Sequence, residues 1–318
     1  MARQRGNRWQ ADVVIDGARK RLSFATQEEA ENYERLIAQG YSPSLQHTLK
    51  AFADEQHARV WGENKTAEKV FGDLRVIYRY IPASTSLVSI TDLAVDDMIT
   101  RMKNDGLANG TINRKLAVLS KLLRRAKKLG LLSALPEIER QREGKGRDRV
   151  WSKEDERKAL EFLEHHGMLS TAALVRFLLY TGCRVGEAYD LDRADVSGKT
   201  ITFRETKNGT TRVIPMVPNA ELGWKYICRT SNAAKPFSVV PRDTFRGHWE
   251  RLRVHFGAAE DRSFVPHMLR HTCATRLVQA GVDLPRVMKW MGHKSVQVTM
   301  RYSHLAPKDL DLAAAALS

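Results

Sequence analysis

Cysteines and long apolar runs are scarce in this 318-residue chain. The three cysteines, Cys183, Cys228 and Cys273, are an odd number without a Cys-x-x-Cys pair. This pattern argues against a disulfide framework or a zinc ribbon and fits a reducing compartment. The N-terminal segment MARQRGNRWQADVV lacks the apolar core of a signal peptide, and no run of about 18 apolar residues predicts a membrane span. We therefore expect a soluble, cytoplasmic protein with no membrane partner.

Acidic residues are outnumbered by basic ones. Lys and Arg total 52 against 37 Asp and Glu, a formal net charge of +15. Such an excess favours a polyanionic partner, most often nucleic acid. The alternative, a charge that only aids solubility, is weaker wherever the basic residues cluster. The length allows two modest domains, or one domain with an added module.

The first 40 residues have the pattern of a small accessory module. Residues 8–25 predict a β-hairpin around Asp16-Gly17. Residues 26–40 predict a helix, with a capping box of Thr26 and Glu29 at its start and Gly40 at its end. Forty residues bury little core. We expect this module to bind DNA through Arg19, Lys20 and Arg21. The alternative is a basic hairpin that only caps the next domain.

Residues 42–136 predict a helical domain. Apolar residues recur at helical spacing from Ile112 to Leu129. Between Arg101 and Lys128 there are nine Lys or Arg and one acidic residue, Asp105. A solvated helix face usually mixes both signs, so the one-sided charge favours contact with phosphates. The expected DNA-binding residues are Arg114, Lys115, Lys121, Arg124 and Arg125.

The segment 137–150 is charged, nearly free of apolar residues, and predicts a linker to a second domain, 151–318. Ser152 and Asp155 predict a capped helix at the start of that domain. Two β-rich runs joined around Asn208-Gly209 predict a small antiparallel sheet among several helices. The expected fold class is mainly α with small β-sheets (α+β), in a multi-domain chain.

The segment PHMLRHTCATR, residues 266–276, first raises the question of a metal site. His267 and His271 are four residues apart and share a helix face, as two zinc ligands would. Arg270 between them disfavours a cation, and Met268 stands where zinc peptidases need a glutamate base. We therefore expect no metal and no cofactor, and a structural His271.

Five segments of the second domain carry side chains suited to handling a phosphodiester. Each has an ordinary structural explanation when taken alone; for example, Arg184 can form an ion pair with Glu187, and a lone Tyr usually packs in a core. Their order along the chain is more informative than any single member. The residues are Arg184 in TGCRVGE, Lys207 in RETKNGTTR, His267 and Arg270 in HMLRH, His293 in MGHKS, and Tyr302 in TMRYSHL.

The ordered set R…K…HxxR…H…Y resembles the tyrosine recombinases, also called phage-type integrases. Residues 150–305 carry the resemblance most strongly, in TGCRVGEAYDL, HMLRHTCATRLVQAG and VMKWMGHKSVQVTMRYSHL. Residues 42–135 resemble the core-site-binding domain of this family. Residues 1–40 resemble the small arm-binding domain of lambdoid integrases.

The resemblance implies a covalent mechanism on double-stranded DNA. Tyr302 corresponds to the nucleophile, which forms a 3′-phosphotyrosyl bond and releases a 5′-hydroxyl. Arg184 and Arg270 correspond to the arginines that bind the non-bridging oxygens, to which planar guanidinium groups are suited. Lys207 corresponds to the general acid on the leaving oxygen, although Lys199 is nearby.

The remaining motif residues have supporting roles by the same resemblance. His267 corresponds to a hydrogen-bonding or base partner near the nucleophile, His293 to a phosphate-supporting residue, and Glu187 to a residue that orients the charged groups. The family implies a homo-tetramer on synapsed core-type and arm-type sites, a DNA-bending host protein, a directionality factor, and a C-terminal segment that docks on a neighbouring protomer. Three alternative functions stay open. They are a two-domain chromosome- or plasmid-dimer-resolving recombinase, a non-catalytic repressor derived from an integrase, and a type IB topoisomerase.

Overall fold

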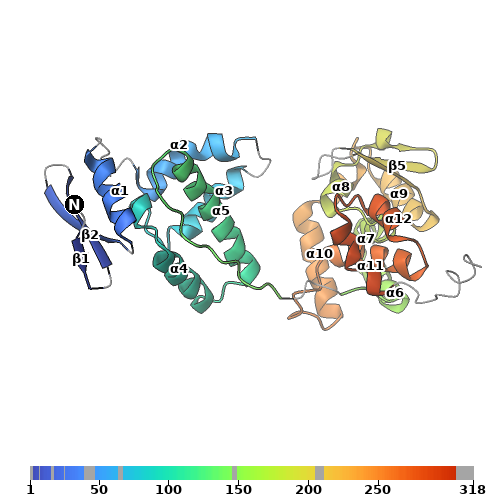
Figure 1. Ribbon diagram of the computed structural model, residues 1–318. Helices are drawn as coiled ribbons and strands as arrows, with labels where there is room; N and C mark the ends of the chain where they lie inside the picture. The colour runs from blue at the N-terminus through green and yellow to red at the C-terminus, as the bar shows by residue number, and fades with distance from the viewer. Residues whose placement is uncertain are drawn as a thin grey trace, which may run out of the picture. The chain divides into compact units, whose positions relative to one another are not determined.

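The computed structural model forms two compact units, residues 1–145 and 146–318 (Figure 1). It describes residues 3–6, 8–15, 18–24, 26–38, 47–63, 67–144, 149–204 and 211–305. The division between the units falls inside the segment predicted to be a linker. Across the described ranges, no helix is long and apolar enough to cross a membrane.

The first unit begins with a three-stranded antiparallel sheet and one helix. The strands follow the order β1-β2-β3, and β2 pairs with β3 from Trp9↔Phe24 to Ile15↔Ala18. The predicted hairpin and helix are therefore present, while β1 was not predicted because its sequence RQR has no apolar alternation. A small core of Ala11, Val13, Ala30 and Tyr33 joins sheet and helix. The bounds are β1 Arg3–Arg5, β2 Arg8–Ile15, β3 Ala18–Phe24 and α1 Gln27–Ala38.

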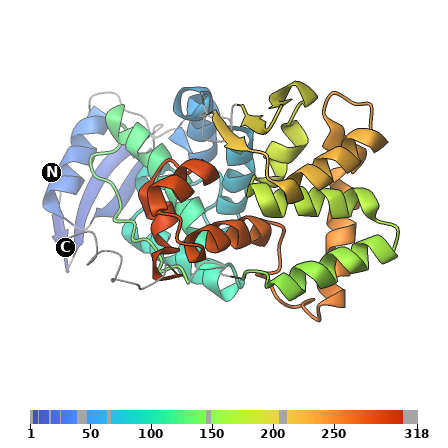
Figure 2. The ribbon, with the colours of Figure 1, turned by 90° about the vertical axis from the view of Figure 1, so that its right-hand side faces the viewer.

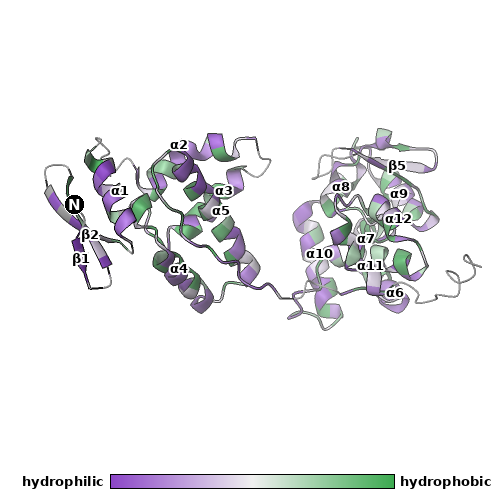
Figure 3. Cartoon of the chain, viewed as in Figure 1, coloured by the Kyte–Doolittle hydropathy of each residue, from purple (hydrophilic) through white to green (hydrophobic). Residues whose placement is uncertain are grey.

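The rest of the first unit is helical, as predicted. In α5 the predicted apolar stripe is buried from Ile112 to Ala126, whereas Leu129, after the last turn, is 44% exposed. Figure 3 shows hydrophobic and hydrophilic residues alternating along these helices. The helices thus bury one face each in a common core. Their bounds are α2 Leu49–Trp61, α3 Ala67–Ile77, η2 Leu87–Ser89, α4 Asp92–Asn104 and α5 Asn109–Lys128.

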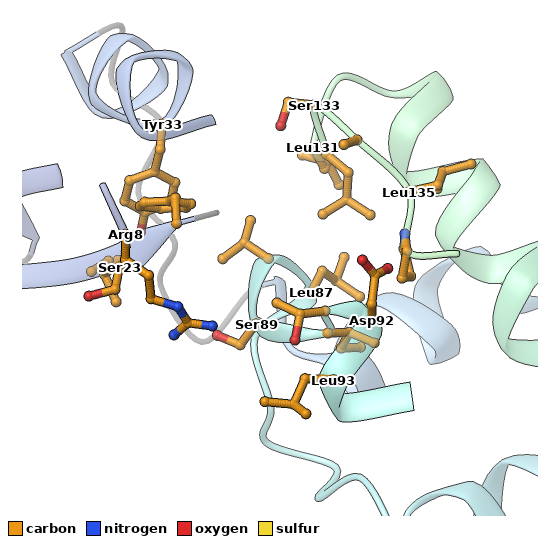
Figure 4. Close-up of a pocket in the computed structure, with 18 residues that line it drawn as sticks. Arg8, Ser23, Tyr33, Leu87, Ser89, Asp92, Leu93, Leu131, Ser133 and Leu135 are labelled. Carbon is orange, nitrogen blue, oxygen red and sulfur yellow. The ribbon is translucent and has the colours of Figure 1, made fainter. Parts of the chain in front are cut away.

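A pocket of about 480 Å³ lies within the first unit (Figure 4). Arg8 and Tyr33 line it from the sheet and α1, and Leu87 and Leu93 line it from the helical part. Val88 packs against the small core of the sheet module. The module and the helical part therefore share apolar contacts around a hollow.

The second unit is mainly helical with a small antiparallel sheet of order β4-β5-β6. Its first helix starts with the predicted capping box of Ser152 and Asp155. The structure thus confirms the predicted α+β class. The bounds are α6 Lys153–His165, α7 Leu169–Thr181, α8 Val185–Asp190, η3 Arg193–Asp195, β4 Val196–Ser197, β5 Thr200–Phe203, β6 Arg212–Pro215, α9 Pro218–Thr230, η4 Pro236–Val239, α10 Arg242–His255, α11 His267–Gln279, α12 Leu284–Met291, α13 Val296–Met300 and η5 Ser303–Leu305.

Helix α7 forms the centre of this second core. Its sequence LSTAALVRFLLYT is apolar on nearly all sides, which is the pattern of a buried helix. It lies beside α6, α9 and α11 (Figure 2). A second cluster, including Cys273, Val287, Met291 and Tyr302, joins α11 and α12 to the end of the described chain. This packing brings the end of α7 close to α11 and α12.

Candidate active site

The end of α7 places Arg184 at the edge of the core. Gly182 has φ +64°, and a Cβ there would lie 2.9 Å from both Cys273 Sγ and Met291 Sδ, so a glycine is required for this turn. Two residues later, Arg184 precedes α8. Its Nη1 donates to Glu187 Oε1 at 2.7 Å and its backbone N–H donates to Glu187 Oε2 at 2.9 Å. The ion pair considered from the sequence is present.

Arg270 on α11 is the most buried cation of the site, with 3% of its surface exposed. Its Nη1 donates to the carbonyl of Gly182 at 2.7 Å, and its Nη2 donates to the carbonyl of Met291 at 2.5 Å. Burial, together with the nearby charge of Arg184, lowers the pKa of Arg270 to about 10. The guanidinium therefore stays charged at neutral pH and is fixed by two loops from different parts of the chain.

Arg212 on β6 is a site residue that the sequence interpretation missed. It is 7% exposed, its Nη2 donates to Glu187 Oε2 at 2.7 Å, and its guanidinium lies 4.3 Å from the ring centre of Phe203. The alternation of inward and outward residues along β6 could have indicated it, because Arg212 and Ile214 both point inward. A basic residue at an inward strand position needs a partner, and here the partner is Glu187.

Glu187 links the two arginines. Burial opposes its ionisation, but the hydrogen bonds and charges of Arg212 and Arg184 outweigh burial and hold the pKa of Glu187 at about 2. The carboxylate is therefore charged at any physiological pH. This arrangement fits the expected orienting role of Glu187, since one carboxylate fixes two guanidinium groups.

The lowered pKa of Glu187 predicts a pH-dependent contribution to the stability of the second unit. Because the pKa falls from 4.5 to about 2 on folding, the contribution is complete above pH 4.5 and is lost as the pH falls towards 2. Its size is about 3 kcal/mol, at about 1.4 kcal/mol per pKa unit. In Glu187→Gln we expect a loss of about 3–5 kcal/mol at neutral pH, because Arg212 keeps a buried, uncompensated charge.

Urea denaturation of the two proteins between pH 7 and pH 3 measures this effect. The wild-type protein should lose more stability on acidification than Glu187→Gln does. Glu161→Gln, an exposed change on α6, serves as the matched control and should follow the wild type. Equal stability of wild type and Glu187→Gln at pH 7 would contradict the assigned role of this carboxylate.

His293 and His267 complete the polar cluster. His293 follows Gly292, which ends α12 with φ +65°, and its Nδ1 lies 2.9 Å from Thr299 Oγ1. Burial, and then the charges of Arg270, Arg184 and Arg212, lower the pKa of His293 to about 4. Its imidazole is thus neutral at physiological pH. His267 is exposed at the first residue of α11.

Tyr302 lies just after α13, with 6% of its surface exposed. Its ring packs in the cluster of α11 and α12, and its hydroxyl lies 2.5 Å from His271 Nδ1. His271 is itself 8% exposed, and its ring centre is 4.8 Å from that of His267. The sequence interpretation took His271 as the structural member of this motif and gave no sign of its contact with the hydroxyl of Tyr302.

Lys207 lies outside the described residues, as does the turn at Asn208-Gly209. The strands that flank this segment are described: β5 ends at Phe203 and β6 begins at Arg212, and the two pair through Phe203↔Arg212. Lys199, the other lysine considered, is exposed just before β5. The assignment of Lys207 as general acid stays a prediction.

The predicted DNA-binding residues differ in their surroundings. Arg114, Lys121 and Arg124 on α5 are exposed, and Arg125 is half-buried with its Nε donating to Gln56 Oε1 at 3.0 Å. The expectation for Lys115 is wrong: it is 7% exposed and its ammonium forms an ion pair with Asp73. Position 115 falls on the inner side of α5, where a lysine serves packing and pairing.

The basic residues of β3 lie on an exposed strand. Arg19 donates from Nε and Nη2 to the two carboxylate oxygens of Asp12, at 2.8 and 2.6 Å, and Arg21 Nε lies 3.6 Å from the same carboxylate. Both arginines are well exposed, so this pairing is weak and can be exchanged for phosphate. Lys20 belongs to the same strand.

Within the described ranges, no group of three or more His, Cys, Asp or Glu residues could hold a metal ion. His267 and His271, the pair that first raised the question, instead stack edge to face near Tyr302. The polar groups of the site are therefore dominated by guanidinium and imidazole, which suit an anionic ligand.

Comparison with known proteins identifies similar chains. Residues 149–309 match the phage integrase family. The tyrosine recombinase XerC of Rhizobium meliloti (strain 1021) is 27% identical over 247 residues, which are 70% of this chain and 75% of the relative. The tyrosine recombinase XerA of Saccharolobus solfataricus (strain P2) is 30% identical over 139 residues, 43% of this chain and 46% of the relative.

Two solved structures share the fold. The Tn1549 transposon integrase in complex with a circular intermediate DNA superposes with a TM-score of 0.69 at 20% identity, over 85% of this chain and 98% of that one. A lambda integrase dimer bound to a COC′ core site gives a TM-score of 0.69 at 16% identity, over 95% and 94% of the two chains. The mainly helical architecture is thus shared with DNA-bound integrases.

Proposed function

Because the chain belongs to the phage integrase family and is a tyrosine recombinase, we propose that it is the integrase of a phage or similar mobile element. It cleaves and rejoins DNA strands at specific sites through a covalent 3′-phosphotyrosine intermediate. The observation that carries the catalytic part is that Arg270 binds the carbonyl of Gly182, two residues before Arg184, and the carbonyl of Met291, two residues before His293. Tyr302 follows α13 and packs in the apolar cluster formed by α11 and α12.

The chemistry assigns one role to each part of this cluster. Arg184 and Arg270 bind the non-bridging oxygens of the scissile phosphate, where negative charge is spread in the transition state. Since Arg270 is fixed by the carbonyls of Gly182 and Met291, it needs little reorganisation when the phosphate arrives. His293 is neutral and can donate a hydrogen bond to the phosphate without adding another charge.

Attack by the hydroxyl of Tyr302 keeps the energy of the phosphodiester in the protein–DNA bond. A second strand with a free 5′-hydroxyl can then displace Tyr302 without ATP. Lys207 is proposed to donate a proton to the leaving 5′-oxygen, as general acid. His267 and Glu187 support the reaction, the first near the nucleophile and the second by orienting Arg184 and Arg212.

DNA binding is proposed to involve both parts of the first unit. The exposed cations of α5, namely Arg114, Lys121 and Arg124, contact the phosphates of core-type sites, and Arg125 assists from its half-buried position. The β3 residues Arg19, Lys20 and Arg21 contact arm-type sites. Affinity should fall steeply with salt, because each phosphate contact releases counterions. The active form is a tetramer on synapsed sites, assisted by a DNA-bending host protein and a directionality factor.

The N-terminal sheet module favours an integrase over a dimer-resolving recombinase of the XerC type. That alternative needs only a helical DNA-binding domain and a catalytic domain. The superposition with the lambda integrase dimer covers 95% of this chain, so it includes at least part of this module. Binding to a second class of DNA site requires a separate DNA-binding module. The N-terminal sheet, with exposed arginines on β3, is suited to that task.

Substitution of the β3 arginines tests this distinction. In Arg19→Gln/Arg21→Gln we expect unchanged cleavage of an isolated core duplex and at least a tenfold loss of integration between full attachment sites, since only the latter uses arm contacts. Gel-shift titration and an integration assay measure the two activities. Arg157→Gln, an exposed change on α6, is the control. Unchanged integration by the double variant would favour the XerC-type alternative.

A further inference from the structure

The contact between His271 and Tyr302 points to a base other than His267, the residue that the family resemblance offered for a hydrogen-bonding or base role. We infer that His271 is a catalytic residue: its Nδ1 binds the hydroxyl of Tyr302 and accepts the phenol proton as Tyr302 attacks the scissile phosphate. This inference rests on the proposed function, in which Tyr302 is the nucleophile. The observation behind it is the 2.5 Å distance between Tyr302 Oη and His271 Nδ1.

The position of His271 on α11 separates it from the phosphate-binding residues. Successive residues of a helix point about 100° apart, so His271 and its neighbour Arg270 face different directions. Arg270 points to the carbonyls of Gly182 and Met291, while His271 points to Tyr302. One turn of one helix therefore presents both a phosphate ligand and a partner for the nucleophile.

Burial makes this hydrogen bond specific. His271 and Tyr302 are 8% and 6% exposed, so little water competes for the hydroxyl. In such surroundings a hydrogen bond is stronger and better directed than at the surface. The ring of Tyr302 also belongs to the buried apolar cluster that includes Val287 and Met291, and this packing limits the positions that its hydroxyl can adopt.

A tyrosine hydroxyl keeps its proton at neutral pH and is a weak nucleophile until a base removes that proton. The other members of the cluster are less suited to this task. Arginines do not accept a proton in proteins, which excludes Arg184, Arg212 and Arg270. The Nδ1 of His293 is engaged with Thr299, and His267 is exposed at the helix start. A histidine in hydrogen-bond contact with the hydroxyl is the usual general base.

The proposed step balances its protons and electrons. The proton of Tyr302 Oη passes to His271 Nδ1, and the Oη electron pair forms the bond to phosphorus. The bond from phosphorus to the 5′-oxygen breaks, its electron pair stays on that oxygen, and the general acid supplies a proton there. In the reverse, joining step His271 returns its proton to the released Oη of Tyr302.

Substitution of His271 is the first test. His271→Ala removes the contact, whereas His271→Asn keeps an acceptor oxygen near the position of Nδ1 but cannot take a proton. The substrate is a nicked suicide duplex recovered by binding selection from a randomised DNA pool. We expect both variants to form the covalent adduct about 10²–10⁴-fold more slowly, the usual contribution of a general base. His165→Asn, an exposed change on α6, should cleave as the wild type does.

A fluorinated nucleophile separates proton transfer from mere support of the fold. Tyr302 is replaced by 3,5-difluorotyrosine, whose phenol is more acidic and ionises with little help from a base. Each His271 variant is compared with the His271 protein carrying the same residue 302. With 3,5-difluorotyrosine at position 302, the His271 variants should form the covalent adduct less than tenfold more slowly than the matching His271 protein. A deficit caused by altered packing would keep its size.

The possible results are distinct. If the wild-type protein forms no adduct on any recovered duplex, the proposed function itself fails. If the wild type reacts but His271→Ala matches or exceeds its rate, or the deficit persists with 3,5-difluorotyrosine, only the role of His271 is wrong. Should both His271 variants unfold, ¹⁵N-histidine NMR of the wild type against Tyr302→Phe decides: the Nδ1 resonance of His271 must shift, and an unchanged resonance would overturn the inference.

Discussion

Tyr302→Phe is expected to abolish covalent attachment to DNA while leaving DNA binding intact. The change removes only the hydroxyl that we propose attacks phosphorus, and the ring still fills the cluster between α11 and α12. The stability cost should be about 1 kcal/mol for the lost hydrogen bond, and up to about 3 kcal/mol if His271 is left unpaired. Denaturing electrophoresis of the protein with a labelled suicide duplex measures attachment, and a gel shift measures binding.

Tyr226→Phe is the matched control for this substitution. Tyr226 lies on α9 and is half-buried, so Tyr226→Phe makes the same chemical change away from the proposed site. It should retain full attachment. A residual adduct with Tyr302→Phe at a level near that of wild type would mean that a different side chain is the nucleophile.

Arg270→Lys should reduce the cleavage rate by about 10³–10⁵-fold, the range for losing a transition-state arginine. A lysine keeps the charge but offers one ammonium in place of a planar fork, so it cannot bind both the carbonyls of Gly182 and Met291 and a phosphate. One unpaired carbonyl should also cost about 1–3 kcal/mol of stability. Single-turnover cleavage and thermal denaturation measure the two effects.

Arg157→Lys provides the comparison for this change. Arg157 is exposed on α6 and forms ion pairs with Glu154 and Glu161. Since exposed pairs contribute little, this control should cleave and denature as the wild type does. Cleavage by Arg270→Lys within tenfold of wild type would contradict the role given to the buried guanidinium.

Much of the fold follows from local patterns in the sequence. The Ser152 capping box and the apolar stripe of α5 each depend on residues near one another in the chain, and the structure contains both. The order R…K…HxxR…H…Y indicated the family because it records spacing as well as chemistry. The described members lie between α7 and α8, on α11, just after α12 and just after α13.

The missed features depend on contacts between distant parts of the chain. Arg212 joins the site because β6 packs near Gly292, where a Cβ would lie 2.9 Å from Arg212 Cδ. His271 meets Tyr302 across 31 residues. Lys115 is buried because Asp73 on α3 faces it. In each case a single polar residue gives no sign of its partner until the helices are packed.

The central claim is that Tyr302 becomes linked to the 3′ end of a cleaved strand. The most direct measurement is isolation of the wild-type adduct on a nicked suicide duplex, followed by trypsin digestion and mass spectrometry. We predict that the nucleotide is attached to the peptide that starts at Tyr302, after Arg301, and that the released strand carries a 5′-hydroxyl that polynucleotide kinase can label. Attachment to another residue, or through a 5′-phosphate, would contradict the account.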